Sequence, residues 1–425
     1  MKTDTAFEMA AASVRFGPGV TREVGMDLVD LGVRRVMVLT DPNLRDLPPV
    51  AAVMESLTRE KLEFEVFDHV RVEPTDGSFR EAISFAQAGS FDAFVAVGGG
   101  STIDTAKAAN LYTGYPADFL DYVNPPIGKG KPVPGPLKPL IAIPTTAGTG
   151  SETTGVAIFD FAEMHAKTGI AHRRLKPSLG LVDPENTRTV PPMVAASTGL
   201  DVLCHAVESY TALPFNQRPA PERPLLRPAY QGSNPISDVW SAEAMRLTSR
   251  YLLRVAKDPG DEEARAGMLL AASYAGMGFG NAGVHLPHGM SYAVSGLVRE
   301  YWPPGYRVDH ALVPHGMSVI LNAPAVFRFT APACPERHLQ AAQYLGADVS
   351  KASPADAGKI LAERITTFMQ ALAIPNGLSA VGYTRADIPQ LVQRTLPQHR
   401  VTKLSPRPAG ERELAELFED ALLGW

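Results

Sequence analysis

The stretch FDAFVAVGGGSTIDTAKAANLY, residues 91–112, decides the fold class of this chain. Its first part is an apolar, β-rich run that leads directly into three glycines, Gly98, Gly99 and Gly100. Ser101 then opens a segment with a helical pattern. A buried strand followed at once by a glycine turn and a helix is typical of a sheet whose parallel strands are connected by helices.

The same glycines predict an anion site. They let a phosphate approach the backbone closely, and the free N–H groups at the start of a helix point at it. The pattern is not the Rossmann fingerprint, because Ile103 stands where the third glycine is required. It is not a Walker loop either, since no Gly-Lys-Ser/Thr follows. Taken alone, the three glycines favour an ordinary glycine-rich turn between strand and helix.

Strand and helix patterns alternate through the first half of the chain. Further strand-like runs occupy residues 35–40, 64–70, 139–146, 156–161 and 178–184, and helical patterns lie near residues 19–31, 47–59 and 77–88. This alternation predicts an α/β domain with a largely parallel sheet. After Pro191-Pro192 the patterns are helical, apart from a proline-rich loop at 214–235. We expect an α/β domain at residues 1–192 and an all-α domain at residues 193–425.

Two other predicted strands end in polar residues that suit a nucleotide. Asp41 follows one strand, and an acid there can bond a ribose hydroxyl and disfavour a 2′-phosphate. The segment 144–152, PTTAGTGSE, follows another and supplies Thr145 and Thr146. Open α/β sheets bind ligands at the carboxyl ends of their strands. Together with the glycine turn, these strand ends predict a dinucleotide site that prefers NAD to NADP, although Asp41 alone also fits an Asp-Pro turn.

The helical half carries a candidate metal site. Asp201 and His205 lie four residues apart, which places both on one face of a helix. His288 and His315 follow, each inside a Pro-His-Gly where the chain can change direction. One carboxylate and three imidazoles suit Fe(II) or zinc better than magnesium or calcium. A hydrogen-bonded core histidine is the alternative for any one of them, and it weakens because all four residues fall in the helical half.

Composition narrows the class of protein. The chain has 425 residues, of which 45% are hydrophobic and 20% charged, as in ordinary globular domains. The net charge of −5 without a basic run makes nucleic acid an unsuitable partner. No run approaches the roughly 20 apolar residues of a membrane span. The first residues carry no leader-like pattern and only two cysteines are present, so we expect a cytoplasmic protein.

These motifs, in this order, resemble the iron-dependent alcohol dehydrogenase family. The matching segments are GGGSTIDTAK (98–107), PTTAGTGSE (144–152), Asp201-x-x-x-His205, His288-Gly-Met and Pro-His-Gly at 314–316. Further segments are similar to one branch, the hydroxyacid-oxoacid transhydrogenases: VRVEPTD (70–76), FLDYVNPPIGKGKPV (119–133), RPAYQGSNPISD (227–238), FGNAGVHLPHGMSY (279–292) and LPQHRVTKLSP (396–406). The resemblance covers essentially the whole chain.

The resemblance implies specific roles. It implies a dinucleotide-binding domain at residues 1–192 and a metal-binding catalytic domain at residues 193–425, with the active site in the cleft between them. The metal ligands would be Asp201, His205, His288 and His315. The NAD-binding residues would be Asp41, Gly98, Gly99, Gly100, Ser101, Thr145, Thr146, Thr149 and Ser151.

The same resemblance implies hydride transfer from 4-hydroxybutyrate to 2-oxoglutarate, with a Lewis-acid metal. Separately, we expect a homo-oligomer, a dimer. The wider family often has histidine four positions after the third ligand, but here that residue is Tyr292. We therefore expect Tyr292 or His285 to handle the proton. Both substrates are carboxylates, so the site needs a cation, for which bidentate arginine is suited. The candidates are Arg218, Arg223 and Arg227 and the run His172-Arg173-Arg174, and among them we favour Arg227.

Three other functions compete with this interpretation. An NAD-dependent alcohol or 4-hydroxybutyrate dehydrogenase would release NADH instead of keeping it. A sugar-phosphate lyase on the same fold is disfavoured by the shortage of lysine and arginine around the ligand motifs. If the chain were a non-catalytic NAD-binding protein, replacing His288 with alanine would leave its activity intact.

Overall fold

A computed structural model describes residues 2–164 and 166–425. The chain divides into two compact units, Ala11–Val190 and the combination of Met1–Ala10 with Pro191–Trp425. Within the described residues, no helix has both the length and the apolar character needed to cross a membrane.

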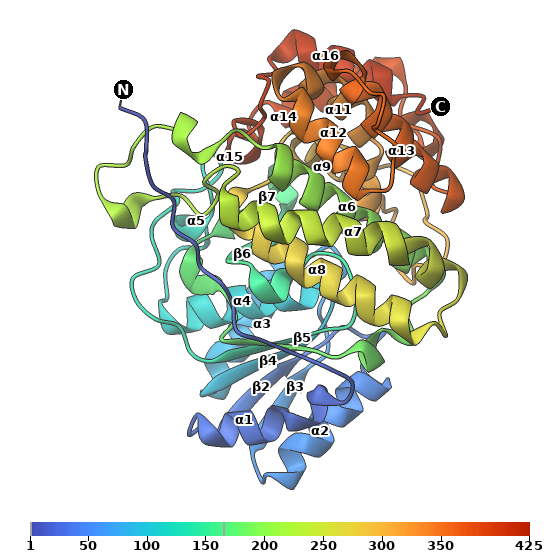
Figure 1. Cartoon of the computed structure of the whole chain (residues 1–425). Coiled ribbons are helices and arrows are strands. Elements are labelled where there is room, and N and C mark those ends of the chain that lie inside the picture. Colours follow the sequence, from blue (N-terminus) through green and yellow to red (C-terminus); the bar gives the residue numbers. More distant parts are fainter. Residues whose placement is uncertain (1, 165) are drawn as a thin grey trace. The chain divides into compact units, whose positions relative to one another are not determined.

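The unit Ala11–Val190 is built on a six-stranded parallel sheet with the order β1-β8-β5-β4-β2-β3 (Figure 1). The strands are β1 Val14–Phe16, β2 Arg35–Leu39, β3 Glu63–Phe67, β4 Ala93–Gly98, β5 Leu140–Pro144 and β8 Leu179–Val182. A separate antiparallel hairpin joins β6 Val156–Phe161 to β7 Ala166–Ala171. The helices are α1 Val24–Asp30, α2 Pro48–Arg59, α3 Asp76–Gly89, α4 Gly100–Gly114 and α5 Phe119–Tyr122.

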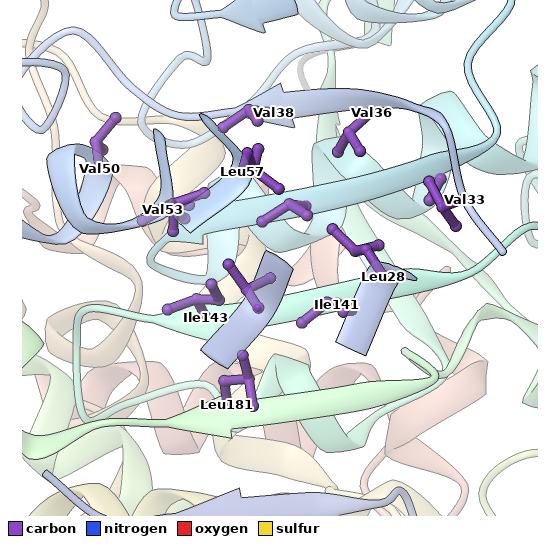
Figure 2. Close-up of a cluster of buried hydrophobic side chains, with 14 of the residues drawn as sticks. Leu28, Val33, Val36, Val38, Val50, Val53, Leu57, Ile141, Ile143 and Leu181 are labelled. Carbon is purple, nitrogen blue, oxygen red and sulfur yellow. The ribbon is translucent and has the colours of Figure 1, made fainter. Parts of the chain in front are cut away.

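Both faces of this sheet are covered, because successive strand residues point to opposite sides and both sets are apolar. In β2, Val36 and Val38 pack with α1 and α2, as part of the cluster drawn in Figure 2. Met37 and Leu39 point the other way and pack with α3 and α4. The predicted largely parallel α/β sheet is confirmed.

Two strands escaped the sequence patterns for physical reasons. Strand β1 has three residues and lies at the sheet edge, and none of them is buried, so it shows no apolar alternation. Strand β7, AKTGIA, lacks a run of β-branched or aromatic residues, and its six residues all pair with β6. Pairing with a partner strand, rather than local propensity, therefore accounts for β7.

In the long segment of the second unit, the described regular elements are helices, which confirms the predicted all-α half. Its helices are α6 Pro192–Thr211, α7 Pro235–Lys257, α8 Glu262–Ala282, α9 Leu286–Gly296, α10 His315–Ile320, α11 Ala323–Thr330, α12 Pro335–Tyr344, α13 Ala357–Ala371, α14 Ile388–Thr395, α15 His399–Thr402 and α16 Glu411–Ala421. Helices α6, α7 and α8 pack pairwise against one another.

The N-terminal residues belong to this helical unit. Thr3 forms an antiparallel bridge with Pro219 in the proline-rich segment. The Asp4 carboxylate pairs with Arg218 at 2.7 Å and with Arg227 at 3.1 Å. The helical structure described for the proline-rich segment before Pro235 is limited to short 3₁₀ turns, at Phe215–Gln217 and Pro224–Leu226, as expected where proline removes backbone donors.

Candidate metal and dinucleotide sites

One face of α6 carries three side chains of the candidate metal site. Asp201 and His205 lie one turn apart on this helix, and both are buried. Glu208, three residues further, shares that face and is fully buried. The ring of His205 is fixed by stacking on Phe279 of α8, with 3.9 Å between ring centroids and 7° between planes.

The other two predicted ligands come from the starts of two helices. His288 is the third residue of α9, and His315 is the first residue of α10. The structure brings one ligand atom from each of Asp201, His205, His288 and His315 within 4.8 Å of one another. The side chain of His315 is 23% exposed, against 5% or less for the other three, so the cluster is open on the His315 side.

Close packing at glycines holds these helix starts in place. A Cβ on Gly316 would lie 2.1 Å from the Ser197 carbonyl oxygen and 2.9 Å from Asp201 Cβ, so α10 approaches α6 as closely as backbone allows. A Cβ on Gly289 would lie 2.6 Å from Thr402 Cγ2, so α15 is equally close to α9. The glycine after each of the two histidines is therefore required for close packing.

Glu208 is a part of the site that the sequence analysis missed. Its carboxylate contacts Nδ1 of His288 and accepts the backbone N–H groups of His285, at 2.9 Å, and of His288, at 3.2 Å. Nε2 of His288 is thereby left to face Nε2 of His205, 3.0 Å away. Metal-binding histidines commonly have such a carboxylate on their second nitrogen. The signal was present in the sequence, because Glu208 lies three residues after His205 and seven after Asp201.

The electrostatics of the cluster fit a cation. Burial favours an uncharged Asp201, but the imidazoles of His205, His315 and His288 outweigh it and hold the pKa of that carboxyl below its usual range. Burial also opposes a charged His288, but Glu208 and Asp201 raise the pKa of that imidazole above its usual range. Within the described part of the chain, no lysine or arginine lies within ion-pairing distance of Asp201 or Glu208.

Unsatisfied polar atoms in the cluster also fit a bound cation. Oδ1 of Asp201 and Nδ1 of His205 are buried without a hydrogen-bond partner among the described residues. Buried groups of this kind are rare in folded proteins unless something binds them. The donor set of one carboxylate and three imidazoles therefore fits a divalent ion of the iron or zinc type.

The two candidate proton-handling residues lie in different surroundings. Tyr292, on α9, is buried with its ring 6.5 Å from the ring of His315, and its Oη accepts a hydrogen bond of 3.0 Å from Nη2 of Arg400. His285 is fully buried, with Nε2 3.0 Å from Thr211 Oγ1. Burial lowers the pKa of His285 to about 4.

In the other unit, the predicted nucleotide-binding residues gather at the carboxyl ends of three adjacent strands. Strand β4 ends at Gly98 and pairs on one side with β2, which Asp41 follows, and on the other with β5, which Thr145 follows. Asp41 is buried, and its Oδ1 accepts the Asn43 N–H at 2.9 Å. Gly99 is the N-cap of α4, so the start of this helix opens at the same strand ends.

The glycine turn and the threonine loop interlock. A Cβ on Gly100 would lie 2.5 Å from Thr149 Cγ2, and a Cβ on Gly99 would lie 3.1 Å from Thr146 Oγ1. Glycine is thus required here to admit the neighbouring loop. The hydroxyl of Ser101 accepts the backbone N–H of Glu73 at 3.2 Å.

Ser151 takes part in a buried network that supports this loop. Its hydroxyl donates to Asp104 Oδ1 at 2.5 Å and accepts from Lys107 Nζ at 2.6 Å. Lys107 is fully buried and also donates to the Val156 carbonyl oxygen at 2.8 Å. The only local sign of Lys107 in the sequence was its place at the end of GGGSTIDTAK, which gave no indication of these partners.

The arginines proposed for a substrate carboxylate are engaged elsewhere where the structure shows their partners. Arg218 and Arg227 both pair with Asp4, and Arg174 Nη1 donates to the Val133 carbonyl oxygen at 2.7 Å. The arginine beside Tyr292 is instead Arg400, which was not among the candidates.

Comparison with known proteins places these sites in one family. The model described as iron-containing alcohol dehydrogenase matches residues 11–184, and the model described as Fe-containing alcohol dehydrogenase family, C-terminal, matches residues 229–422. The chain belongs to the iron-containing alcohol dehydrogenase family. It is therefore an oxidoreductase acting on CH–OH groups, and the family supports both a metal and NAD as cofactors.

Within the family, the chain falls in the hydroxyacid-oxoacid transhydrogenase branch. It is 61% identical to the mitochondrial hydroxyacid-oxoacid transhydrogenase of Bos taurus, over 99% of this chain and 91% of that protein. Identity to the enzyme of the same name from Homo sapiens is 60%, over 99% and 90%.

Solved structures of other oxidoreductases also align with nearly the whole chain. A 1,3-propanediol oxidoreductase aligns with a TM-score of 0.86 at 28% identity, over 98% of this chain and 100% of that one. A sulfoacetaldehyde reductase of Bifidobacterium kashiwanohense, solved in complex with NAD⁺, aligns with a TM-score of 0.80 at 25% identity, over 99% of each chain.

One prediction is wrong. The expected cytoplasmic location is contradicted by the relatives from Bos taurus, Xenopus tropicalis and Homo sapiens, which are all named mitochondrial and point to that organelle. The expectation rested on the character of the first residues and on two cysteines. Neither feature of the sequence specifies a compartment.

Proposed function

We propose that this protein transfers hydride from 4-hydroxybutyrate to 2-oxoglutarate, giving succinate semialdehyde and D-2-hydroxyglutarate. One observation carries the proposal: the 61% identity to a hydroxyacid-oxoacid transhydrogenase extends over 99% of the chain and so spans both the metal cluster and the nucleotide loops. Two coupled half-reactions then balance, since the hydride and proton lost by the alcohol are those gained by the oxo acid.

We propose Fe(II) as the ion, with Zn(II) as the alternative that the same ligands accept. Asp201, His205, His288 and His315 would hold it, and Glu208 would orient the ring of His288. The bound ion supplies a Lewis acid for the substrate oxygen. Metal analysis of protein prepared without chelator or added zinc tests this assignment, and a protein whose activity follows zinc alone would contradict it.

For the dinucleotide, we propose NAD rather than NADP. Asp41 would accept from the ribose hydroxyls, and Gly98, Gly99, Gly100 and Ser101 would receive the phosphates at the start of α4. Thr145, Thr146 and Thr149 would line the same strand ends, with Ser151 supporting them through Lys107. When bound, the nicotinamide carries the hydride between the two substrates.

Each half-reaction also moves a proton, and we propose Tyr292 Oη for this step. Because Oη accepts from Arg400, its own hydrogen is free to point at a substrate. His285 is the second candidate, but its pKa of about 4 keeps it neutral at neutral pH, and its ring is enclosed between Thr211 and Phe327. Tyr292→Phe should lower kcat about a hundredfold or more with metal content unchanged, whereas an unchanged kcat would favour His285.

The decisive test is an assay without added NAD. Purified protein is mixed with 4-hydroxybutyrate and 2-oxoglutarate, and D-2-hydroxyglutarate is measured over many turnovers. We expect product in excess of the enzyme and no accumulation of free NADH. If product forms only when stoichiometric NADH is supplied, the transhydrogenase proposal fails.

The solved neighbours named alcohol dehydrogenases support the second candidate, an NAD-dependent alcohol or 4-hydroxybutyrate dehydrogenase. Steady NADH production from alcohol and free NAD would identify it. His288→Ala serves as the control for both, since we expect it to lose metal and activity together. A homodimer is proposed as the assembly and is tested by sedimentation of the holoenzyme.

A further inference from the structure

An arginine with no acidic partner among the described residues lies beside Tyr292. Arg400, in α15, donates from Nη2 to Tyr292 Oη at 3.0 Å, and its guanidinium lies 4.9 Å from the centroid of the Tyr230 ring. Its second terminal nitrogen, Nη1, is buried with no hydrogen-bond partner among the described residues. No carboxylate of the described residues lies within ion-pairing distance of it, in contrast to Arg218 and Arg227, which share Asp4.

Such an arrangement is costly unless an anion completes it. A guanidinium stays charged in proteins, and a buried charge without a counterion is strongly unfavourable. A tyrosine hydroxyl and an aromatic face lower this cost without neutralising the charge. The guanidinium of Arg400 therefore has one terminal nitrogen, Nη2, fixed by Tyr292, and a second, Nη1, with no partner among the described residues. This geometry suits a carboxylate.

The position of Arg400 connects it to the metal cluster. Tyr292, which it holds, lies with its ring 6.5 Å from that of His315, the one ligand with an exposed side. Helix α15 packs on α9 at Gly289, directly after the ligand His288. The guanidinium thus lies one side chain away from the open side of the cluster, within the same unit.

From this geometry, we propose that Arg400 binds the carboxylate of the hydroxy acid and oxo acid substrates through Nη1, while Nη2 positions Tyr292. The proposal rests on the proposed function and assigns its substrate selectivity to one side chain. It explains why the site takes acids: an alcohol without a carboxylate would leave Nη1 buried and unpaired. It also replaces Arg227, whose guanidinium is engaged by Asp4.

The test compares Arg400→Gln, Arg400→Lys and the control Arg412→Gln, which removes an exposed guanidinium paired with Glu413. Holoenzymes are titrated with butyrate, which has the carboxylate but no hydroxyl to oxidise, and assayed with 4-hydroxybutyrate. Loss of a charge-assisted pair predicts butyrate affinity about ten- to a hundredfold weaker in Arg400→Gln, with a parallel rise in KM. Arg400→Lys should fall between, and Arg412→Gln should match the unmodified enzyme.

The outcomes distinguish the assignment of Arg400 from the proposed function. NADH affinity and metal content measured on every variant show whether the fold is intact, and Arg400→Lys keeps the charge if Arg400→Gln does not fold. If the unmodified enzyme uses 4-hydroxybutyrate and Arg400→Gln keeps its KM and butyrate affinity, the assignment of Arg400 fails alone. If the unmodified enzyme neither binds butyrate nor uses 4-hydroxybutyrate, the proposed function fails.

Discussion

The carboxylate of Glu208 contacts Nδ1 of His288, the ring nitrogen that does not face His205. Glu208 is fully buried and has no lysine or arginine partner among the described residues, so its charge acts on this imidazole. The pair fixes which nitrogen of His288 is available to an ion and makes that nitrogen a stronger donor.

Replacing Glu208 with glutamine should therefore weaken metal binding about 10- to 100-fold while keeping the side-chain shape. Metal retained after dialysis against graded chelator measures this effect. Glu243→Gln is the matched control, because Glu243 pairs with Arg246 on the exposed side of α7. Equal metal retention in the two variants would show that Glu208 serves packing alone.

Substitution of Gly100 by alanine should impair dinucleotide binding. The added methyl would lie 2.5 Å from Thr149 Cγ2, so the glycine turn and the threonine loop must move apart. Repacking of about 1–3 kcal/mol corresponds to an affinity for NADH about 5- to 150-fold lower. Gly114→Ala, at the other end of α4, is the control, since its nearest neighbour would be 4.0 Å away. We expect fluorescence titration to separate the two variants, and equal affinities would contradict the close approach.

Asp41→Asn tests the preference for NAD. The asparagine oxygen can still accept the Asn43 N–H, so the turn after β2 is preserved and only the charge is lost. Binding of NADPH should improve about tenfold or more because repulsion of the 2′-phosphate disappears. Titrations with NADH and NADPH give the ratio of the two affinities. A ratio equal to that of the unmodified protein would show that Asp41 only stabilises the turn after β2.

The pairing of Asp4 predicts a pH-dependent stability. A hydrogen bond from Arg227 outweighs burial and lowers the pKa of the Asp4 carboxyl to about 2. Because the folded-state pKa lies below the unfolded value, the stabilisation is present above about pH 4. It is lost as the pH falls towards 2.

Asp4→Asn should therefore unfold at lower urea concentration than the unmodified protein at pH 7. The difference should be constant down to about pH 5 and shrink below it. The metal ligands titrate in both proteins alike, so the comparison isolates Asp4. A difference that persists unchanged at pH 3 would mean that the carboxylate charge contributes nothing.

The two thiols should be unreactive in the native protein. Burial raises the pKa of Cys204 well above its usual range and that of Cys334 to about 11. Thiolates are the reactive species, so a disulfide reagent at pH 8 should label neither cysteine until denaturant is added, and then both. Stoichiometric labelling of the folded protein would contradict the raised pKa values of these thiols.

Local spacing was enough to predict much of the molecule. The four-residue interval of Asp201 and His205 predicted one helix face. The Pro-His-Gly motifs predicted changes of chain direction at His288 and His315, and the structure shows that both residues lie in the first turn of a helix. The apolar runs that alternate with helical patterns predicted the buried strands, because strands covered on both faces are apolar along their whole length.

What local spacing did not predict depends on contacts between distant residues. Arg400 meets Tyr292 across 108 positions and Lys107 meets Ser151 across 44, and nothing in either short segment indicates its partner. Glu208 lay within reach, as the next acid on the face of His205, yet a charge on a helix is more often solvated than buried.

The connection of Asp4 to Arg227 spans 223 positions and encloses the whole α/β unit, Ala11–Val190. In order of synthesis, the α/β unit is a continuous segment that can fold as soon as it emerges. The helical unit uses residues from both sides of that segment, so its N-terminal strip stays without its arginine partners until more than half of the chain has been made. The fold is thus a helical domain with an α/β domain inserted after its first ten residues, and closing this long loop is expected to be a late step.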